Sequence, residues 1–153
     1  MGLTLAATGA SAAAQAAQQP VMDNEAVRRA CIPAGQEERP MNTLTRAQQT
    51  AMVGCSLREA ARQLEAQLPI RADESTVLRA ISVQNAQLTY EFEVSVNAAE
   101  VTAEQRAAAV QSTRTRVCAS QNMLNTMSYG GSYRYIWRDS AGVELARTII
   151  ERC

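Results

Sequence analysis

The chain contains neither histidine nor lysine, and these two absences restrict its chemistry more than anything that is present. Without histidine there is no Ser-His-Asp triad, no Cys-His pair, no histidine ligand for zinc and no imidazole base that works near neutral pH. Without lysine there is no Schiff base and no phosphate-loop lysine. Carboxylate-pair and tyrosine chemistry stay open. Because no strong catalytic or cofactor motif is present, we expect no enzyme, no catalytic residue, no cofactor and no metal.

An excess of one charge is also lacking, since 15 arginines balance 15 acidic residues and the formal net charge is zero. Proteins that bind nucleic acid or anionic membranes usually carry a basic excess. No later segment approaches the run of about 20 apolar residues that crosses a bilayer. We therefore expect no nucleic-acid partner and no membrane span. A chain of 153 residues is long enough for one domain with a real core.

Residues 1–22 have a short apolar stretch followed by alanine, serine and glutamine. Ala-x-Ala sites such as Ala10-Ser11-Ala12 are typical of the end of a secretory signal, although the charged start of such a signal is missing. The sequence predicts that residues 1–22 are a signal-peptide remnant or a disordered tail, and that residues 23–153 form a single domain. A disordered tail on a cytoplasmic protein is the alternative interpretation.

The four cysteines fit export, because they are even in number and lack the close spacing of zinc or thioredoxin-like sites. Of three possible pairings we favour Cys31–Cys55 and Cys118–Cys153, since each pair stays within one half of the chain. Loops of these lengths would each stabilise the fold by about 3–4 kcal/mol. Four buried free thiols are the alternative. Two arginines precede Cys31, which is foreign to a lipobox, so we expect a periplasmic protein that is not lipidated in this form.

Helix signals fall in four places. Asp23 is a candidate N-cap for residues 24–30, and Thr43 or Thr45 starts the main helix, which runs to about Leu68. Thr102 opens a capping box for a helix to about residue 117, and Ser120 precedes a short helix that glycines end. The expected apolar stripe of the main helix comprises Ala51, Cys55, Leu57, Ala61, Leu64 and Leu68.

Two hairpins lie between and after these helices. Residues 76–83 and 87–96 form the first, with Val77, Ile81 and Val83 expected on one face, and residues 132–138 and 143–150 form the second. The strict alternation in residues 87–96 predicts a sheet with one packed and one wet face. The order of elements predicts an α+β fold in which helices pack on one face of an antiparallel four-stranded sheet made of two hairpins, stapled by disulfides.

Most aromatic residues fall on the expected packed face. We expect them to form a core under helices 45–68 and 102–117, and a platform on which a ligand stacks is the alternative. They are Tyr90, Phe92, Tyr133, Tyr135 and Trp137.

Two carboxylates, Glu91 and Glu93, fall on the wet face instead. Arginines of neighbouring strands are expected to pair with them, and an acid/base pair is the alternative. The candidate ion-pair partners are Arg79, Arg134 and Arg138.

A family resemblance follows from residues 68–153. It is carried by Leu68-Pro-Ile, Thr76-Val-Leu-Arg-Ala-Ile-Ser-Val, Leu88-Thr-Tyr-Glu-Phe, Arg116-Val-Cys118, Tyr129-Gly-Gly-Ser-Tyr-Arg-Tyr, Arg138-Asp-Ser-Ala-Gly142 and the final Cys153. This outline resembles small exported bacterial domains and is similar to the beta-class pilotins of type II secretion, which escort secretin subunits. The resemblance implies a sheet-and-helix domain with a Cys118–Cys153 disulfide and a groove that receives a partner's C-terminal helix.

Three functions follow from these observations. The first is a non-enzymatic periplasmic domain that binds another envelope protein, as an accessory or pilotin-like factor of a secretion complex, through the wet sheet face or an edge strand such as 143–150. The second is an inhibitor or immunity protein against a secreted hydrolase, which would insert a loop such as 32–42. The third is an enzyme that uses Glu91, Glu93 or Asp139, and it requires a deep pocket beside two carboxylates.

Overall fold

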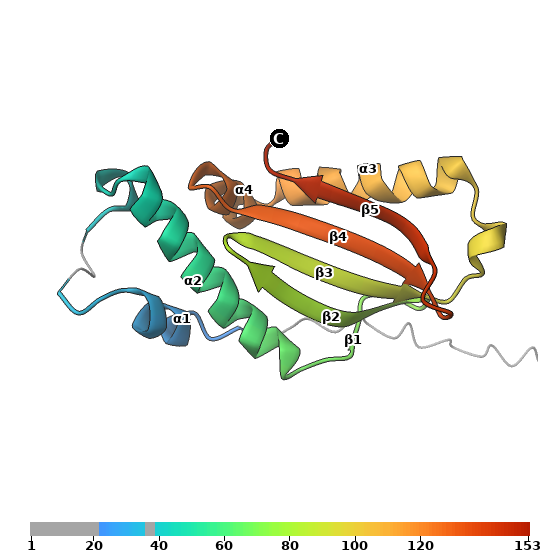
Figure 1. The fold of residues 1–153 in the computed structure, drawn as a ribbon, viewed down its shortest axis with the longest axis horizontal. Coiled ribbons are helices and arrows are strands. Elements are labelled where there is room, and N and C mark those ends of the chain that lie inside the picture. Colours follow the sequence, from blue (N-terminus) through green and yellow to red (C-terminus); the bar gives the residue numbers. More distant parts are fainter. Residues whose placement is uncertain (1–21, 36–38) are drawn as a thin grey trace, which may run out of the picture.

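The computed structural model describes residues 22–35 and 39–153, so the predicted tail, apart from Met22, and loop residues 36–38 lie outside the described residues. The first part holds α1 (Asn24–Cys31), and a 3-10 turn (Met41–Thr43) precedes α2 (Arg46–Glu65). Five strands and two more helices complete the fold (Figure 1). They are β1 (Ile70–Arg71), β2 (Thr76–Gln84), β3 (Gln87–Val94), a 3-10 turn (Ala98–Glu100), α3 (Ala103–Ala119), α4 (Gln121–Ser128), β4 (Ser132–Asp139) and β5 (Glu144–Ile150).

The sheet order β1-β2-β3-β4-β5 follows the chain. The hairpins β2–β3 and β4–β5 are antiparallel, as predicted. The prediction of a four-stranded antiparallel sheet is wrong, because β3 and β4 are parallel and the short β1 adds a fifth strand beside β2. The 17 residues of α3 span about 26 Å, roughly the length of β3, and so return the chain to the end at which β3 began.

Each α-helix of the described residues begins at an N-cap side chain that the sequence predicts. The oxygen of each cap side chain accepts a hydrogen bond from a backbone N–H of the first turn. In α2 and α3 the side chain of a glutamine also accepts a hydrogen bond from the backbone N–H of the cap residue, which completes a capping box. Of the two threonines expected to start the main helix, Thr45 is the cap, and this helix ends at Glu65 rather than at Leu68. The other caps are Asp23, Thr102 and Ser120.

Helices α2 and α3 flank the strands, α2 on the β2 side and α3 on the β5 side (Figure 1). The core lies between the sheet and these helices. It contains aliphatic side chains from both hairpins and α2, together with Tyr133, Tyr135 and the fully buried Ile150. Its remaining members are Val53, Leu57, Ala61, Leu64, Ile70, Leu78, Ile81, Ala86, Leu88, Val117 and Met127.

Two details of the expected packing are wrong. The pairing of β2 with β3 shifts register between Leu78 and Ala80, so Leu78 joins the core in place of the expected Val77. On α2, Val53 is buried whereas Ala51 is exposed. Gly54 determines which side of α2 packs against the sheet, because a residue with a larger side chain does not fit there. A Cβ atom at this position would lie 2.7 Å from the carbonyl oxygen of Asn85 in the β2–β3 turn.

Two disulfides hold outer elements to this frame. Cys31–Cys55 joins α1 to α2, and Cys118–Cys153 joins α3 to the chain just beyond β5. They are the pairs that the sequence analysis favours. The Cα atoms lie 5.6 Å apart in the first pair and 5.7 Å apart in the second. The second bond therefore holds α3 at the β5 edge of the sheet.

Candidate functional site

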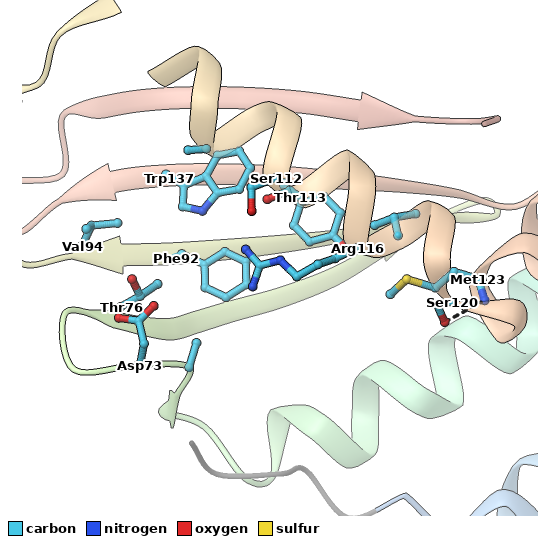
Figure 2. A pocket seen from close by; sticks show the side chains of 14 residues that line it. Asp73, Thr76, Phe92, Val94, Ser112, Thr113, Arg116, Ser120, Met123 and Trp137 are labelled. Carbon is cyan, nitrogen blue, oxygen red and sulfur yellow. Dashed lines mark hydrogen bonds between the residues drawn. The ribbon is translucent and has the colours of Figure 1, made fainter. Parts of the chain in front are cut away.

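A groove opens between α3 and the helix-facing side of the sheet. It has a volume of about 530 Å³, and its floor is made by the second halves of β3 and β4 (Figure 2). One wall is α3 with the start of α4, and the other is the segment between β1 and β2. The lining residues are Ala72, Asp73, Thr76, Phe92, Val94, Ala109, Ser112, Thr113, Arg116, Val117, Ser120, Met123, Tyr135 and Trp137.

The groove exists because α3 carries few large apolar side chains. Only Thr113 and Val117 are buried on this helix, and its first half is rich in alanine. Its apolar residues do not form a continuous packed side, since Val117 is buried but Val110 is only partly buried and Ala107 is exposed. Because α3 packs against β5 and α4 but α2 packs against β2 and β3, the second halves of β3 and β4 lie between the two helices without a cover.

A row of stacked aromatic rings forms the floor. The ring centroids of Tyr90 and Tyr135 lie 5.2 Å apart, those of Tyr135 and Trp137 lie 5.9 Å apart, and those of Phe92 and Trp137 lie 6.3 Å apart. These separations lie in the range of favourable aromatic pairs. Tyr135 is buried as expected of a core residue, whereas Phe92 and Trp137 are half-buried and face the groove. The core interpretation is therefore confirmed for Tyr133 and Tyr135, whereas Phe92 and Trp137 leave part of their rings exposed.

The groove continues past Trp137 toward the start of α3. A second hollow of about 230 Å³ shares Val94, Ala109 and Trp137 with the first and extends to Val101 and Leu145. Its lining is mainly apolar, with Gln105 and Arg106 as its polar members, and it includes Val96, which is exposed. From Gln105 to Ser120 the wall of the combined groove is about 22 Å long, or about four helical turns. Its length and apolar lining therefore suit an amphipathic helix.

Three charged side chains line the combined groove: Asp73, Arg106 and Arg116. Asp73 accepts hydrogen bonds from the backbone N–H (2.9 Å) and hydroxyl (3.0 Å) of Ser75. Desolvation raises the pKa of Asp73. Hydrogen bonds from Ser75 and Thr76 lower it by more, so this pKa lies below its ordinary value. Arg116 points across the floor toward Phe92 (Figure 2). Burial raises the pKa of Tyr135 to about 12, an effect that the positive charge of Arg116 partly offsets.

The carboxylates proposed as acid and base take structural positions on the opposite, wet face. Glu93 accepts two hydrogen bonds from Arg79, at 3.0 and 3.1 Å, and Glu91 lies 3.6 Å from Arg138. The expected third partner, Arg134, forms no ion pair within the part of the chain that the structure describes, and its Nε has no hydrogen-bond partner there. These carboxylates thus act as cross-strand ion pairs.

Asp139, the third candidate, is buried and anchors a turn. Its Oδ1 accepts bonds from the N–H groups of Ala141 (3.0 Å) and Val143 (2.8 Å), and its Oδ2 accepts one from that of Ala98 (3.2 Å). The hollow beside it, near Glu91 and Glu93, measures only about 190 Å³. Asp139 therefore organises the β4–β5 turn and ties it to the segment that leads into α3.

Comparison with known protein families shows to which family this chain is related. Residues 47–153 match the family described as "Type II secretion system (T2SS) pilotin, S protein". The chain belongs to this pilotin family. The match confirms the resemblance found in the sequence and covers the whole groove, whereas α1 and its Cys31 precede it.

Solved structures share the pilotin fold. The chain is similar to the pilotin EpsS of the Vibrio vulnificus type 2 secretion system, with 17% identity, a TM-score of 0.58 and coverage of 68% of this chain and 92% of that one. It is also similar to the type II secretion pilotin AspS of Vibrio cholerae (18% identity, TM-score 0.55, covering 68% and 93%). A putative secreted protein of Pseudomonas aeruginosa gives 17% identity and a TM-score of 0.53, covering 67% and 91%. A search of curated proteins finds no match.

The family resemblance implied a groove, but the sequence did not show where in the fold it lies. The aromatic floor was recognised as a set of residues, but the parallel pairing that places Phe92 beside Trp137 was not predicted. The scarcity of large apolar side chains in residues 103–112 was the available signal, since such a helix cannot cover the sheet beneath it. Among the helices that the structure describes, none is both long and apolar enough to cross a membrane.

Proposed function

We propose that this chain is a non-enzymatic accessory factor of a type II secretion system, and that its groove binds a helical segment at the C-terminus of the system's secretin subunit. Membership in the pilotin family supports the secretion role. The observation that carries the binding role is the uncovered aromatic floor beside α3. The groove wall there is about four helical turns long, and the lining is apolar apart from Asp73, Gln105, Arg106, Arg116 and a few small polar side chains.

The physical case rests on the apolar surface that the groove leaves in water. Phe92, Val94 and Trp137 are only half-buried, and the lining of both hollows is mainly apolar. Burying such surface contributes roughly 25 cal/mol per Å². An amphipathic helix laid along α3 would bury this surface with side chains spaced three and four residues apart, which is the helix-in-groove mode of recognition.

The test is calorimetric titration of the full chain with a peptide of the last 25 or so residues of the secretin encoded in the same genome. Ala109→Gln places a longer polar side chain on the groove wall, and Ala108→Gln makes the same change at an exposed neighbour that does not line it. We expect Ala109→Gln to weaken binding about tenfold, equivalent to about 1.4 kcal/mol, and Ala108→Gln to leave it unchanged. Absence of binding by the unmodified chain, or equal losses in both variants, would contradict the proposal.

We place this function in the periplasm, with residues 23–153 acting as one domain. The two disulfides support this location, because such bonds persist in oxidising compartments. Release of the protein by osmotic shock of the native cells is the expected result, and retention with cytoplasmic markers would contradict it. The alternative of a hydrolase inhibitor rests on loop 32–42, of which residues 36–38 lie outside the described residues.

A further inference from the structure

The two arginines that line the combined groove differ: Arg106 donates hydrogen bonds to backbone carbonyl oxygens, whereas Arg116 has no polar partner among the described residues. Arg116 forms no ion pair and donates no hydrogen bond to any other residue that the structure describes. The other arginines of α3 are engaged: Arg106 donates to the carbonyl oxygen of Ala98 (3.1 Å), and Arg114 donates to that of Arg152 (3.0 Å). Arg116 is exposed, and its guanidinium group extends over the floor toward Phe92 (Figure 2).

The acidic residue that lines the same groove does not balance this charge. The Oδ1 atom of Asp73 is taken up by two hydrogen bonds from Ser75 within its own turn. No ion pair joins Asp73 to Arg116 in the described structure. Water must therefore solvate the guanidinium group when the groove is empty.

A ligand that covers Arg116 has to replace that water. An apolar helix laid over the guanidinium group would leave a charge without a partner, which is costly, whereas a carboxylate would offset the lost hydration with charge-assisted hydrogen bonds. We propose that the groove selects an amphipathic helix carrying an acidic side chain, and that Arg116 recognises this side chain. This inference deepens the proposed function, whose groove it uses, by stating the chemistry of the partner.

The position of Arg116 also fixes where the acidic residue lies on the partner. Arg116 follows Ala109 by seven residues on α3, which is about two turns or 10 Å. Ala109 is the part of α3 that shares both hollows with Val94 and Trp137. The partner helix therefore places its apolar anchor beside Trp137 and its carboxylate about two turns away, toward α4.

The test is a selection from displayed 18-residue helical peptides, with leucine fixed on one face and all other positions random, against the full chain. Peptides are kept if Ala109→Gln weakens their binding and Ala108→Gln does not, so that groove ligands are isolated. The same selection is made against Arg116→Gln and Arg116→Glu. Arg114→Gln is the matched control, because it removes an equal charge from the same helix outside the groove.

We expect the unmodified chain and Arg114→Gln to enrich aspartate or glutamate at one position, about two turns from the anchor. The enrichment should vanish with Arg116→Gln and turn into arginine or lysine with Arg116→Glu. Replacing the selected acid by its amide should weaken binding to the unmodified chain about tenfold and hardly affect binding to Arg116→Gln.

Groove ligands without an acidic preference, or a preference that persists in Arg116→Gln, would overturn the inference. So would a selection that yields no groove ligand. A clear acidic preference together with no affinity for the secretin peptide would leave the inference standing and contradict the proposed function instead.

Discussion

The two sides of the helical layer differ in how completely they cover the sheet. Under α2, large apolar side chains such as Leu57 and Leu64 are buried together with Leu78 and Leu88 of the first hairpin. Under α3, only Thr113 and Val117 are buried on the helix, and the aromatic floor is left partly exposed. The sheet is thus fully covered by apolar side chains under α2, whereas under α3 part of its apolar surface stays exposed.

This difference shows which surface is available for a ligand. Both helices are held at the sheet and each has a disulfide partner, so the groove is not a consequence of loose attachment. It results from small side chains on one well-capped helix. Mutations on the α2 side should therefore change stability alone, whereas those on the α3 side should change binding.

The largest expected effect comes from the disulfides, and it separates the two sides. Replacing both cysteines of either pair by alanine should lower the free energy of unfolding by about 3–4 kcal/mol, given loops of 24 and 35 residues. Only loss of Cys118–Cys153 should also weaken peptide binding, because it frees the C-terminal end of α3. Urea titration and calorimetry measure the two quantities. Equal weakening of binding in both variants would contradict the separation.

Leu57→Ala should have the next largest effect on stability. Leu57 is 7% exposed in the centre of the α2 core, so its truncation should cost about 2–5 kcal/mol in urea unfolding. Met123→Ala, on the groove wall and only partly buried, should cost less than half as much. A smaller loss for Leu57→Ala than for Met123→Ala would show that the two sides have been assigned wrongly.

Gly54→Ala tests how closely α2 approaches the sheet. Alanine favours a helix over glycine by about 1 kcal/mol, but its Cβ would meet the Asn85 carbonyl oxygen at 2.7 Å. We expect a net loss of about 1–3 kcal/mol in urea unfolding, since the contact is with backbone and the helix must shift. Ala51→Gly, at an exposed position of the same helix, provides the reverse change as a control. A stabilised Gly54→Ala would contradict the close packing.

The smallest expected effect involves Glu59 of α2, which belongs neither to the core cluster nor to the groove lining. Hydrogen bonds from Arg62 and Gln63 lower the pKa of Glu59 to about 2 from an ordinary value of 4.5. Because the pKa of Glu59 is lower in the folded protein, its bonds with Arg62 and Gln63 stabilise the fold above about pH 4.5. This stabilisation is lost as the pH falls toward 2.

Arg62→Gln should raise the pKa of Glu59 toward 4.5, as measured by NMR titration of its carboxyl carbon. The variant and the unmodified protein should differ in stability most above pH 4.5 and converge near pH 2. A Glu59 pKa that does not move would show that Arg62 is not the main cause. Peptide binding should be unaffected.

Local features of this fold were predictable because they depend on neighbouring residues. The caps Thr102 and Ser120 and both hairpins follow from short patterns that the structure confirms. The parallel pairing of β3 and β4 was not predicted, because it depends on the direction in which α3 and α4 carry the chain from the end of β3 to the start of β4. The predicted lengths of these two helices were already sufficient for such a parallel connection. The register shift at Leu78 depends on contacts between segments that are distant in the sequence. The same is true of the choice of α2 residues that face the sheet near Gly54.

The candidate site was predictable only as a list of residues. Phe92 and Trp137 were identified as members of an apolar face, but their half-exposure depends on where α3 lies. In the sequence, Arg116 appears only within a segment that carries the family resemblance. Its lack of a partner becomes apparent only when the contacts of the other α3 arginines are known.

The central claim is that the uncovered aromatic floor beside α3 is the binding site, and Trp137 tests it most directly. The chain has a single tryptophan, so its indole N–H gives one isolated NMR signal at the point where the two hollows meet. We expect the secretin peptide to shift this signal and the amide signals of Ala109 and Thr113, while those of Val53 and Leu57 stay in place. Binding that leaves the Trp137 signal unmoved and shifts the α2 signals instead would contradict the account.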